Sequence, residues 1–391
     1  MGLNTKGLHA AMRAQVDNEF LPGVATALLR GPEVVDTFCY GYADKKAGIA
    51  LREDHIFRGF SNTKLVTSAA ILLLWEDGLL QLDDPIERYI PALGQRQVLH
   101  PGATRIDDVE PAHSSITIRQ LMTHTSGLSY GIFDPTTTLA KAYSKAQLRH
   151  PERPMADFIG ALANLPLAFQ PGTAWDYSVA TDVLGYLVEV LSGERFSAFL
   201  AKRIFAPLGM VDTAFHVPAS KLHRLTTLYV GVDVTNPIKP GLLRADNTPY
   251  PGAYVKPTAF QSGGGGLVTT LGDTVCLLQA MLPGGPALLK PQTIQAMATN
   301  QLPDGMWLKF PNFPTWVGRG FGLGSSVCVN PGWLDPAEAT GEVSWGGLAG
   351  TAWWFNPRLN IAGVLMTQRF HGQSGTHTVA FKQEAYKALG Y

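Results

Sequence analysis

Hydrophobic spacing near the N-terminus predicts a short helix followed by a β-hairpin. The helical repeat is carried by apolar residues at every fourth position: Leu8, Met12, Val16 and Phe20. That interval keeps them on one face of an α-helix. Residues 23–41 are rich in β-branched and aromatic side chains and contain a Gly-Pro pair at 31–32. This pair favours a tight turn, so two neighbouring strands are expected around it.

The most apolar stretch of the chain, residues 61–75, predicts a helix at the centre of the protein. Its sequence, SNTKLVTSAAILLLW, has almost no polar position after Thr67. A helix that is apolar all round has to be covered on every side. Its uninterrupted apolar part, 69–75, is far shorter than the ~20 residues that cross a bilayer. Gly78 then supplies a natural stop.

The remaining patterns predict a helical, loop-rich middle and a strand-rich C-terminal third. Helical periods occur at 117–122, 154–165, 181–191 and 194–207. A Thr-Leu-Gly-Asp box at 270–273 predicts one further helix start, and many Pro and Gly residues predict long loops over 215–262. Successive strands are expected at 320–330, 342–356 and 360–369, before a closing helix at 376–389.

Strands at both ends, with helices between them, predict one sheet that takes strands from both termini. We therefore expect an α/β (α+β) organisation in which residues 1–85 and 280–391 form a sheet domain. Residues 86–279 would form an inserted, mainly helical lobe with long loops. The length agrees with two lobes, because 391 residues exceed the roughly 250–300 at which single cores stop growing.

Composition narrows the classes of function. With 46% hydrophobic and 16% charged residues, the chain can bury a large core, which excludes a disordered protein. Its 31 basic and 31 acidic residues balance without a Lys/Arg cluster, so no nucleic-acid partner is expected. Three cysteines are too few and too scattered for a disulfide framework or a zinc site. No segment resembles a signal peptide, which predicts a cytoplasmic protein without a membrane partner.

Candidate chemistry is concentrated at the start of the predicted core helix. Ser61 and Lys64 have an S-x-x-K spacing, which puts both side chains on one helix face. A neutral amine there can accept the serine proton, and burial favours the neutral form. Free N–H groups at the helix N-terminus can stabilise an oxyanion. The spacing also fits a capping serine followed by a surface lysine, but an apolar helix leaves little surface for that lysine.

Other catalytic signatures are absent or incomplete. No serine lies in a G-x-S-x-G elbow, and no histidines have the H-E-x-x-H spacing. The glycine run at 263–266 lacks the P-loop lysine and the third glycine of the dinucleotide motif. It predicts a tight passage of the backbone instead. No metal or organic cofactor is implied.

Four motifs follow one another along the chain in a recognisable order. They are the S-x-x-K at 61–64 with its tail DGLLQLDDPI at 77–86, LMTHTSGL at 121–128, PGTAWDYS at 171–178, and GGGLVTT at 264–270. Together they resemble the penicillin-recognising serine hydrolases, the serine β-lactamase-like superfamily that includes class C β-lactamases, D,D-peptidases and, nearest to this chain, family VIII carboxylesterases. The resemblance spans nearly the whole chain. It implies a mainly antiparallel sheet flanked by helices, plus a helical lobe, with the site between them.

The resemblance also implies roles for single residues. Ser61 would be the nucleophile, and the phenol of Tyr177 would share a proton with Lys64. Which of the two is the base stays open, because a coupled pair titrates as a unit. The backbone N–H groups of Ser61 and Leu348 would form the oxyanion hole. His124 would be a hydrogen-bonded scaffold residue rather than a member of a catalytic triad.

Departures from the family pattern decide the expected substrate. Where β-lactamases carry Lys-Thr-Gly, this chain has Trp345, Gly346 and Gly347, and Val179 stands in place of an asparagine. Without the lysine, a substrate carboxylate loses its charge-assisted partner. An indole wall suits an apolar, uncharged group, as in family VIII esterases. These four residues and Tyr130 are the expected pocket residues.

We therefore expect a carboxylesterase that hydrolyses small, uncharged esters through an acyl-serine intermediate. Three alternatives stay open at this point. One is an amide hydrolase of the same fold, acting on β-lactams or D-amino acid peptides, and another is an acyltransferase. The third is a catalytically inactive sensor, which the retention of Ser61, Lys64 and Tyr177 together disfavours. The sequence does not indicate acyl-chain length or oligomeric state.

Overall fold

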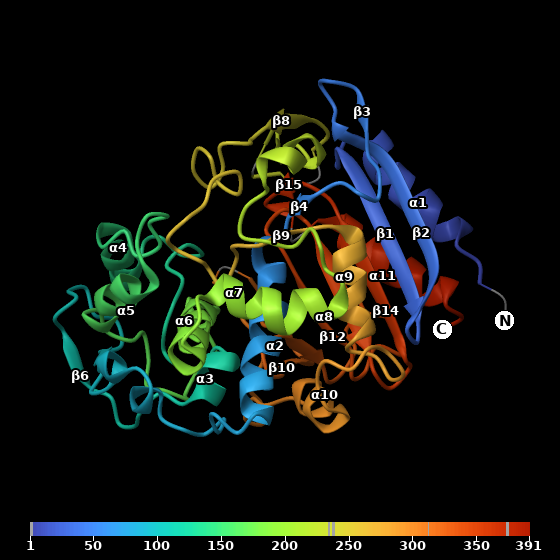
Figure 1. Cartoon of the computed structure of the whole chain (residues 1–391). Coiled ribbons are helices and arrows are strands. Elements are labelled where there is room, and N and C mark those ends of the chain that lie inside the picture. The colour runs from blue at the N-terminus through green and yellow to red at the C-terminus, as the bar shows by residue number, and fades with distance from the viewer. Residues whose placement is uncertain (1–2, 234, 237–238, 312, 373–374) are drawn as a thin grey trace.

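An eight-stranded antiparallel sheet is the central layer of the protein (Figure 1). The computed structural model describes residues 3–233, 235–236, 239–311, 313–372 and 375–391. In spatial order the strands are β10 (Arg319–Phe321), β11 (Ser326–Cys328), β12 (Val343–Gly346), β13 (Ala352–Asn356), β14 (Ile361–Met366), β1 (Gly23–Arg30), β2 (Glu33–Asp44) and β3 (Ile49–Ala50). β14 pairs directly with β1, with Ala25 opposite Met366. Strands from both ends of the chain thus share one sheet. The domain boundaries expected from the sequence stay a prediction.

The predicted N-terminal helix and hairpin are confirmed. Helix α1 (Lys6–Asp17) buries Leu8 and Met12. Phe20 lies beyond the end of this helix, so the four-residue repeat extends further than the helix itself. The hairpin of β1 and β2 turns at Gly31, whose φ of +56° suits glycine.

The prediction for the C-terminal third is wrong in the number of strands, because two of the expected single strands are hairpins. Residues 320–330 form the hairpin of β10 and β11, and residues 342–356 form the hairpin of β12 and β13. Each expected single strand is broken by a glycine in the left-handed region: Gly324 has a φ of +103° and Gly350 a φ of +83°. These glycines lie inside apolar stretches, so hydrophobicity alone does not reveal the reversals.

Helices cover both faces of the sheet because β1 is apolar on both sides. Ala25 and Leu29 belong to the larger core cluster, and Val24 and Leu28 to a second cluster on the opposite face. The second cluster contains side chains of α1 and α11 (Thr376–Ala388). The larger cluster contains side chains of α2 (Thr63–Glu76) and α9 (Leu271–Gln279). Figure 1 shows α1 and α11 beside β1 and β2.

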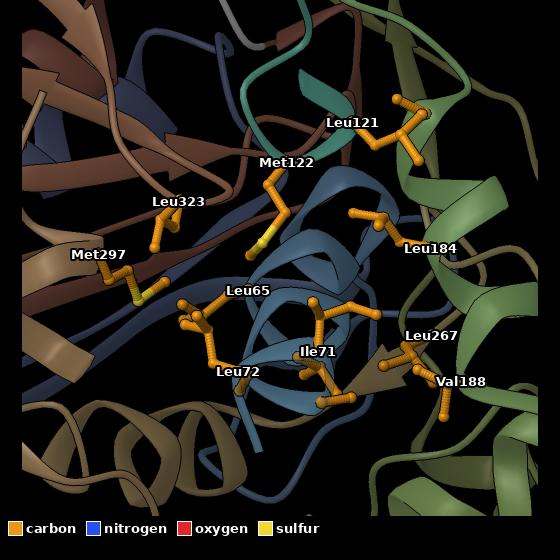
Figure 2. Close-up of a cluster of buried hydrophobic side chains, with 14 of the residues drawn as sticks. Leu65, Ile71, Leu72, Leu121, Met122, Leu184, Val188, Leu267, Met297 and Leu323 are labelled. Atoms are coloured by element: carbon orange, nitrogen blue, oxygen red, sulfur yellow. The ribbon is translucent and has the colours of Figure 1, made fainter. Parts of the chain in front are cut away.

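The predicted core helix is confirmed as α2, and its first twelve residues, 63–74, are all buried. Figure 2 shows Leu65, Ile71 and Leu72 of this helix surrounded by side chains from distant segments. The neighbours include Leu121 and Met122 of α3 (Ile118–Met122), Leu184 and Val188 of α6 (Ala180–Ser192), and Met297 of α10 (Pro291–Met297). A helix without a polar face is stable only in such surroundings.

The middle of the chain is mainly helical, as predicted. Its helices are α3 (Ile118–Met122), α4 (Thr138–Lys145), α5 (Met155–Ala163), α6 (Ala180–Ser192), α7 (Phe196–Leu200) and α8 (Ala206–Leu208). A π-helical turn, Ala201–Phe205, joins α7 to α8, so the predicted helix at 194–207 has an irregular centre. The sequence patterns did not mark α4 or α10 (Pro291–Met297).

Short strands join the loops to the rest of the fold. They form three small sheets: β15 (Arg369–Phe370) with β7 (Tyr229–Gly231) and β8 (Leu242–Arg244), β4 (Phe57–Arg58) with β9 (Val268–Thr269), and β5 (Gln97–Leu99) with β6 (Val109–Pro111). The hydroxyl of Thr270 caps α9 by accepting the N–H of Asp273 at 3.1 Å, as the box predicted. Within the described ranges, no helix combines the length and the hydrophobicity needed to cross a membrane.

Leu72→Ala should lower the free energy of unfolding by about 2–5 kcal/mol, because it leaves a cavity in a packed core. Leu72 is 0% exposed on α2, whereas Leu79, just after this helix, is 46% exposed. Leu79→Ala is the matched control and should change stability by less than about 0.5 kcal/mol. Urea denaturation followed by circular dichroism measures both values. Equal losses would contradict the central position of α2.

Candidate active site

Ser61 lies in a 3₁₀ turn just before α2, and the backbone of this turn is unusual. The preceding residue, Phe60, has a φ of +44°, in the left-handed region. A bulky residue adopts this conformation only where surrounding structure enforces it. The N–H of Gly59 donates to the carbonyl of Leu267 at 2.9 Å, and the N–H of Leu267 donates to the Thr63 hydroxyl at 3.0 Å. Ser61 is left partly exposed at the edge of a buried helix.

The amine of Lys64 is enclosed one helical turn from Ser61. The residue is 1% exposed. Its Nζ donates to the Gly264 carbonyl at 2.7 Å, to the Tyr130 hydroxyl at 3.0 Å and to Ser61 Oγ at 3.4 Å. The same nitrogen lies 4.5 Å from the centroid of the Tyr177 ring. The structure thus brings the serine, the amine and two tyrosines together.

Burial lowers the pKa of Lys64 from its ordinary value to about 7. Desolvation is the main cause, because an ammonium ion loses its hydration in the interior. The negative charge of Asp182 raises the pKa in part, and the positive charge of Arg149 lowers it further. An amine with this pKa is neutral in a large fraction of molecules near pH 7, and the neutral amine is the form that accepts a proton.

Tyr177 precedes α6 and is held by Trp345 of β12. The indole Nε1 of Trp345 donates to the Tyr177 hydroxyl at 3.0 Å. Ser61 also forms a hydrogen bond with this hydroxyl. Burial raises the pKa of Tyr177, while the hydrogen bonds to Ser61 and Trp345 oppose that effect. Trp345 was expected only as an apolar wall, but its N–H also fixes and polarises the tyrosine oxygen.

Tyr130 belongs to the hydrogen-bond network around Lys64, although the sequence suggested only a pocket residue. It is 7% exposed, and burial raises the pKa of its hydroxyl well above the ordinary value. Its ring centroid lies 5.2 Å from that of Tyr177. On the ring face, the guanidinium carbon of Arg149 is 4.8 Å from the centroid. Tyr130 therefore connects the buried amine to an exposed arginine.

His124 lies in a scaffold position. Its Nδ1 accepts the backbone N–H of Ser178 at 3.2 Å and lies 2.9 Å from the Ser178 hydroxyl. Its ring stands edge-on to Tyr177, with centroids 4.9 Å apart. Burial, with a further contribution from Lys64, lowers the pKa of His124 well below the ordinary value. A neutral ring therefore fixes the backbone next to Tyr177.

Asp182 is a buried acid that the sequence patterns did not mark. Its Oδ1 accepts the Ser262 hydroxyl at 2.6 Å and the N–H of Gly264 at 2.9 Å. These bonds place the Gly264 carbonyl on the amine of Lys64. The only available signal was an acid near the start of the apolar helix predicted at 181–191.

The glycine run at 263–266 is the tight backbone passage that the sequence predicted. A Cβ on Gly263 would lie 2.4 Å from the carbonyl oxygen of Thr181. On Gly264 it would lie 2.5 Å from the hydroxyl of Tyr130. Both distances are shorter than any real carbon contact, so side chains at these positions would displace the site.

Gly346 and Gly347 bring the end of β12 against the turn that holds Ser61. A Cβ on Gly347 would lie 2.5 Å from the carbonyl oxygen of Gly59, so this approach depends on glycine. Leu348 follows directly, and its side chain packs against the cluster that contains Phe60. The oxyanion-hole role expected for the Leu348 N–H stays a prediction.

Val179 shapes a cavity of about 840 Å³ without exposing its side chain, which is 0% accessible. It lies at the N-cap of α6, and Tyr130 and Arg149 line the same cavity. The apolar side of the site includes two further aromatic residues that the sequence did not single out. Phe310 lies 5.7 Å from Tyr177 between ring centroids, and Phe133 lies 5.8 Å from it.

These groups define the chemistry of an acyl-transferring serine enzyme of the hydrolase class. A partly exposed hydroxyl lies beside a buried amine with a pKa near neutrality, and a phenol is within reach. Such an arrangement can activate a serine and stabilise a covalent acyl intermediate. In the described part of the chain, no three His, Cys, Asp or Glu side chains gather to hold a metal.

The chain belongs to the Beta-lactamase family, whose model matches residues 8–387. It is 34% identical over 374 residues to Protein Rv1367c of Mycobacterium tuberculosis, covering 94% of this chain and 90% of that protein. It is 29% identical to Esterase EstB of Burkholderia gladioli, with 96% of each protein covered. The solved structure of "EstCE1, a hydrolase with promiscuous acyltransferase activity" shares the fold, at a TM-score of 0.82, 24% identity and 98% coverage of both chains.

The rate should depend on pH through Lys64. Below its pKa of about 7, kcat/KM for a neutral ester should fall about tenfold per pH unit, because only the neutral amine accepts a proton. Asp182→Asn removes an anion that raises this pKa, so the midpoint should move to lower pH. The exposed Asp157→Asn on α5 is the control and should leave the midpoint in place. An upward shift for Asp182→Asn would contradict the assignment.

The hydrogen bond from Trp345 to Tyr177 should be visible in the rate. Trp345→Phe keeps an aromatic ring but removes the N–H donor, so kcat should fall roughly 2- to 10-fold, the worth of one neutral hydrogen bond. Trp353, opposite Trp345 on β13, is a matched control because its Nε1 has no hydrogen-bond partner. Similar kcat losses for Trp353→Phe and Trp345→Phe would remove the special role of this bond.

Proposed function

We propose that this protein is a carboxylesterase that hydrolyses small, uncharged carboxylic esters through an acyl-Ser61 intermediate. The observation that carries the proposal is the buried amine of Lys64, with a pKa of about 7 and its Nζ 3.4 Å from Ser61 Oγ. Identity of 29% to Esterase EstB, over 96% of both proteins, supports an ester as the substrate.

Acylation begins when Ser61 Oγ forms a bond to the ester carbonyl carbon and its proton passes to neutral Lys64. The carbonyl oxygen becomes an oxyanion, which the N–H groups of Ser61 and Leu348 stabilise. As the bond to the alcohol oxygen breaks, the proton reaches that oxygen through the hydroxyl of Tyr177. The products are the free alcohol and an acyl-serine, with the amine neutral again.

Deacylation repeats these steps with water as the nucleophile. Water attacks the acyl carbon and gives a proton to the Lys64 and Tyr177 pair. Collapse of the second oxyanion returns a proton to Ser61 Oγ and releases the carboxylic acid. One pair of groups serves both half-reactions because its protonation state is restored after each.

Uncharged groups suit the β12 side of the site. Trp345 occupies the position where a cation would hold a substrate carboxylate, and Phe310 extends the apolar wall, with ring centroids 6.4 Å apart. Arg319 of β10, two strands away in the sheet, is paired with Asp335 and Glu342. A charge-assisted hydrogen bond to a substrate contributes roughly 1.5–3 kcal/mol. An anionic β-lactam cannot form this bond on the β12 side of the site.

Acyl transfer to an alcohol is the second candidate. The cavity of about 840 Å³ beside Tyr130 leaves room for an acceptor larger than water. Incubation with a vinyl ester and added alcohol, followed by quantification of new ester against free acid, separates the two outcomes. Hydrolysis of β-lactams or D-amino acid peptides is a further alternative. The missing cation on β12 argues against β-lactams, which carry a carboxylate, and leaves the D-amino acid substrates open.

A substrate panel tests the proposal. We expect kcat/KM for p-nitrophenyl acetate and butyrate to exceed that for nitrocefin and benzylpenicillin by at least about tenfold to a hundredfold, which one lost charge-assisted bond provides. Ser61→Ala should abolish turnover of all substrates without loss of fold. Ser114→Ala, at an exposed serine, is the control and should keep full activity. Benzylpenicillin turnover equal to that of the esters would overturn the proposal.

A further inference from the structure

A cationic cavity adjoins the proposed catalytic groups. It has a volume of about 840 Å³ and lies between α4, the segment that follows this helix, and the residues around Tyr130. Lys141, Lys145 and Arg149 line it together with His150. Among its described lining residues there is no aspartate and no glutamate. The volume lies within the usual range for clefts that hold small organic molecules.

Arg149 is the cation nearest to the catalytic groups. Its guanidinium carbon lies over the ring of Tyr130, 4.8 Å from the centroid, and no ion pair to it is found in the described part of the chain. Its charge reaches the interior, since it lowers the pKa of Lys64 and opposes the rise in the pKa of Tyr177. Lys141 differs, because its charge is partly balanced by Asp134.

The contact with Tyr130 uses the ring face, and the described part of the chain supplies no hydrogen-bond acceptor for the N–H groups of Arg149. A planar fork of donors matches the two oxygens of a carboxylate, which a lysine cannot do. The hydroxyl of Tyr130 accepts from Lys64 at 3.0 Å, so one tyrosine side chain separates the guanidinium from the amine. A ligand held by Arg149 would therefore lie next to Tyr130, whose hydroxyl contacts the amine of Lys64.

We infer that this cavity binds the carboxylate of an ester substrate, with Arg149 as its principal partner and Lys145 as a second cation. The inference rests on the proposed ester hydrolysis and extends it from neutral esters to esters that carry a free carboxylate remote from the scissile bond. The position differs from that of the cation missing on β12, so it gives no anchor to the ring carboxylate of a penicillin. Arg149 acts here as a specificity residue and takes no part in the covalent steps.

The test compares esters that differ only in one charge. For a carboxylate on the acyl part, the pair is the mono-p-nitrophenyl ester of adipic acid and the same ester with its free carboxyl methylated. For a carboxylate on the alcohol part, the pair is 4-acetoxybenzoate and its methyl ester. The readout is the ratio of kcat/KM for the charged ester to that for its neutral partner. This ratio cancels any effect of a variant on Lys64, which serves both esters.

Arg149→Gln should lower this ratio about tenfold in one of the two pairs, and that pair identifies which part of the substrate enters the cavity. Arg149→Lys should give an intermediate ratio, because the charge remains while the fork is lost. Raising the ionic strength should reduce the advantage of the charged ester in the wild type, since Arg149 is exposed. Arg195→Gln, at an exposed arginine outside this cavity, is the matched control and should leave the ratio unchanged.

A binding measurement separates this inference from the proposed function. Monomethyl adipate and 4-hydroxybenzoate should bind to the Ser61→Ala variant about tenfold more tightly than to the Ser61→Ala, Arg149→Gln double variant in calorimetry. If the wild type hydrolyses none of the neutral esters, the proposed function fails. The difference in binding between the two variants then tests by itself whether the cavity binds a carboxylate through Arg149. The inference would be overturned if Arg149→Gln left the ratio of kcat/KM values unchanged in both ester pairs and the acids bound equally well to the two variants.

Discussion

The desolvation of one amine governs the arrangement of the site. Lys64 lies near the start of a helix that is covered on every side, so its ammonium form loses the hydration that stabilises it in water. The fold accommodates the group by lowering its pKa to about 7 and by giving its protons three oxygen acceptors. Those acceptors come from the 3₁₀ turn before α2, from the loop after α3 and from the glycine run before β9. The same burial that supports the core therefore keeps part of the amine in the neutral form, which can accept a proton.

Close backbone contact is what allows these segments to meet. The carbonyl of Gly264 reaches the amine only because residues 263–266 carry no side chains, and Asp182 holds that carbonyl in place through the Gly264 N–H. Just after β12, the backbone of Gly347 approaches the carbonyl of Gly59 closely for the same reason, because it carries no side chain. A methyl group at any of these positions would separate Ser61 and Lys64 from their neighbours, and proton transfer requires hydrogen-bond distance.

Charge is distributed unevenly around the candidate active site, and this distribution underlies the proposed selectivity. On the β12 side, an indole replaces a cation and donates its N–H to Tyr177 instead. On the Tyr130 side, Arg149 has no ion pair within the described part of the chain and borders a cavity without carboxylates among its described lining residues. Under the proposals made above, one substrate would place its neutral part against the apolar wall of Trp345 and Phe310, where a charged group would lose its hydration. Its anionic part would lie near the exposed guanidinium of Arg149.

The sequence by itself determined the local elements and the family. The apolar run at 61–75 specified α2, the Gly-Pro pair specified the first hairpin, and the ordered motifs indicated the fold and the roles proposed for Ser61, Lys64 and Tyr177. The tertiary structure alone decided which groups meet: Asp182 with Gly264, Trp345 with Tyr177, and Arg149 with Tyr130. It also replaced two expected C-terminal strands with hairpins. The physical reason is that periodicity reports which face of an element is buried, whereas a pKa, a hydrogen bond or a reversal at a glycine depends on segments that are distant in sequence.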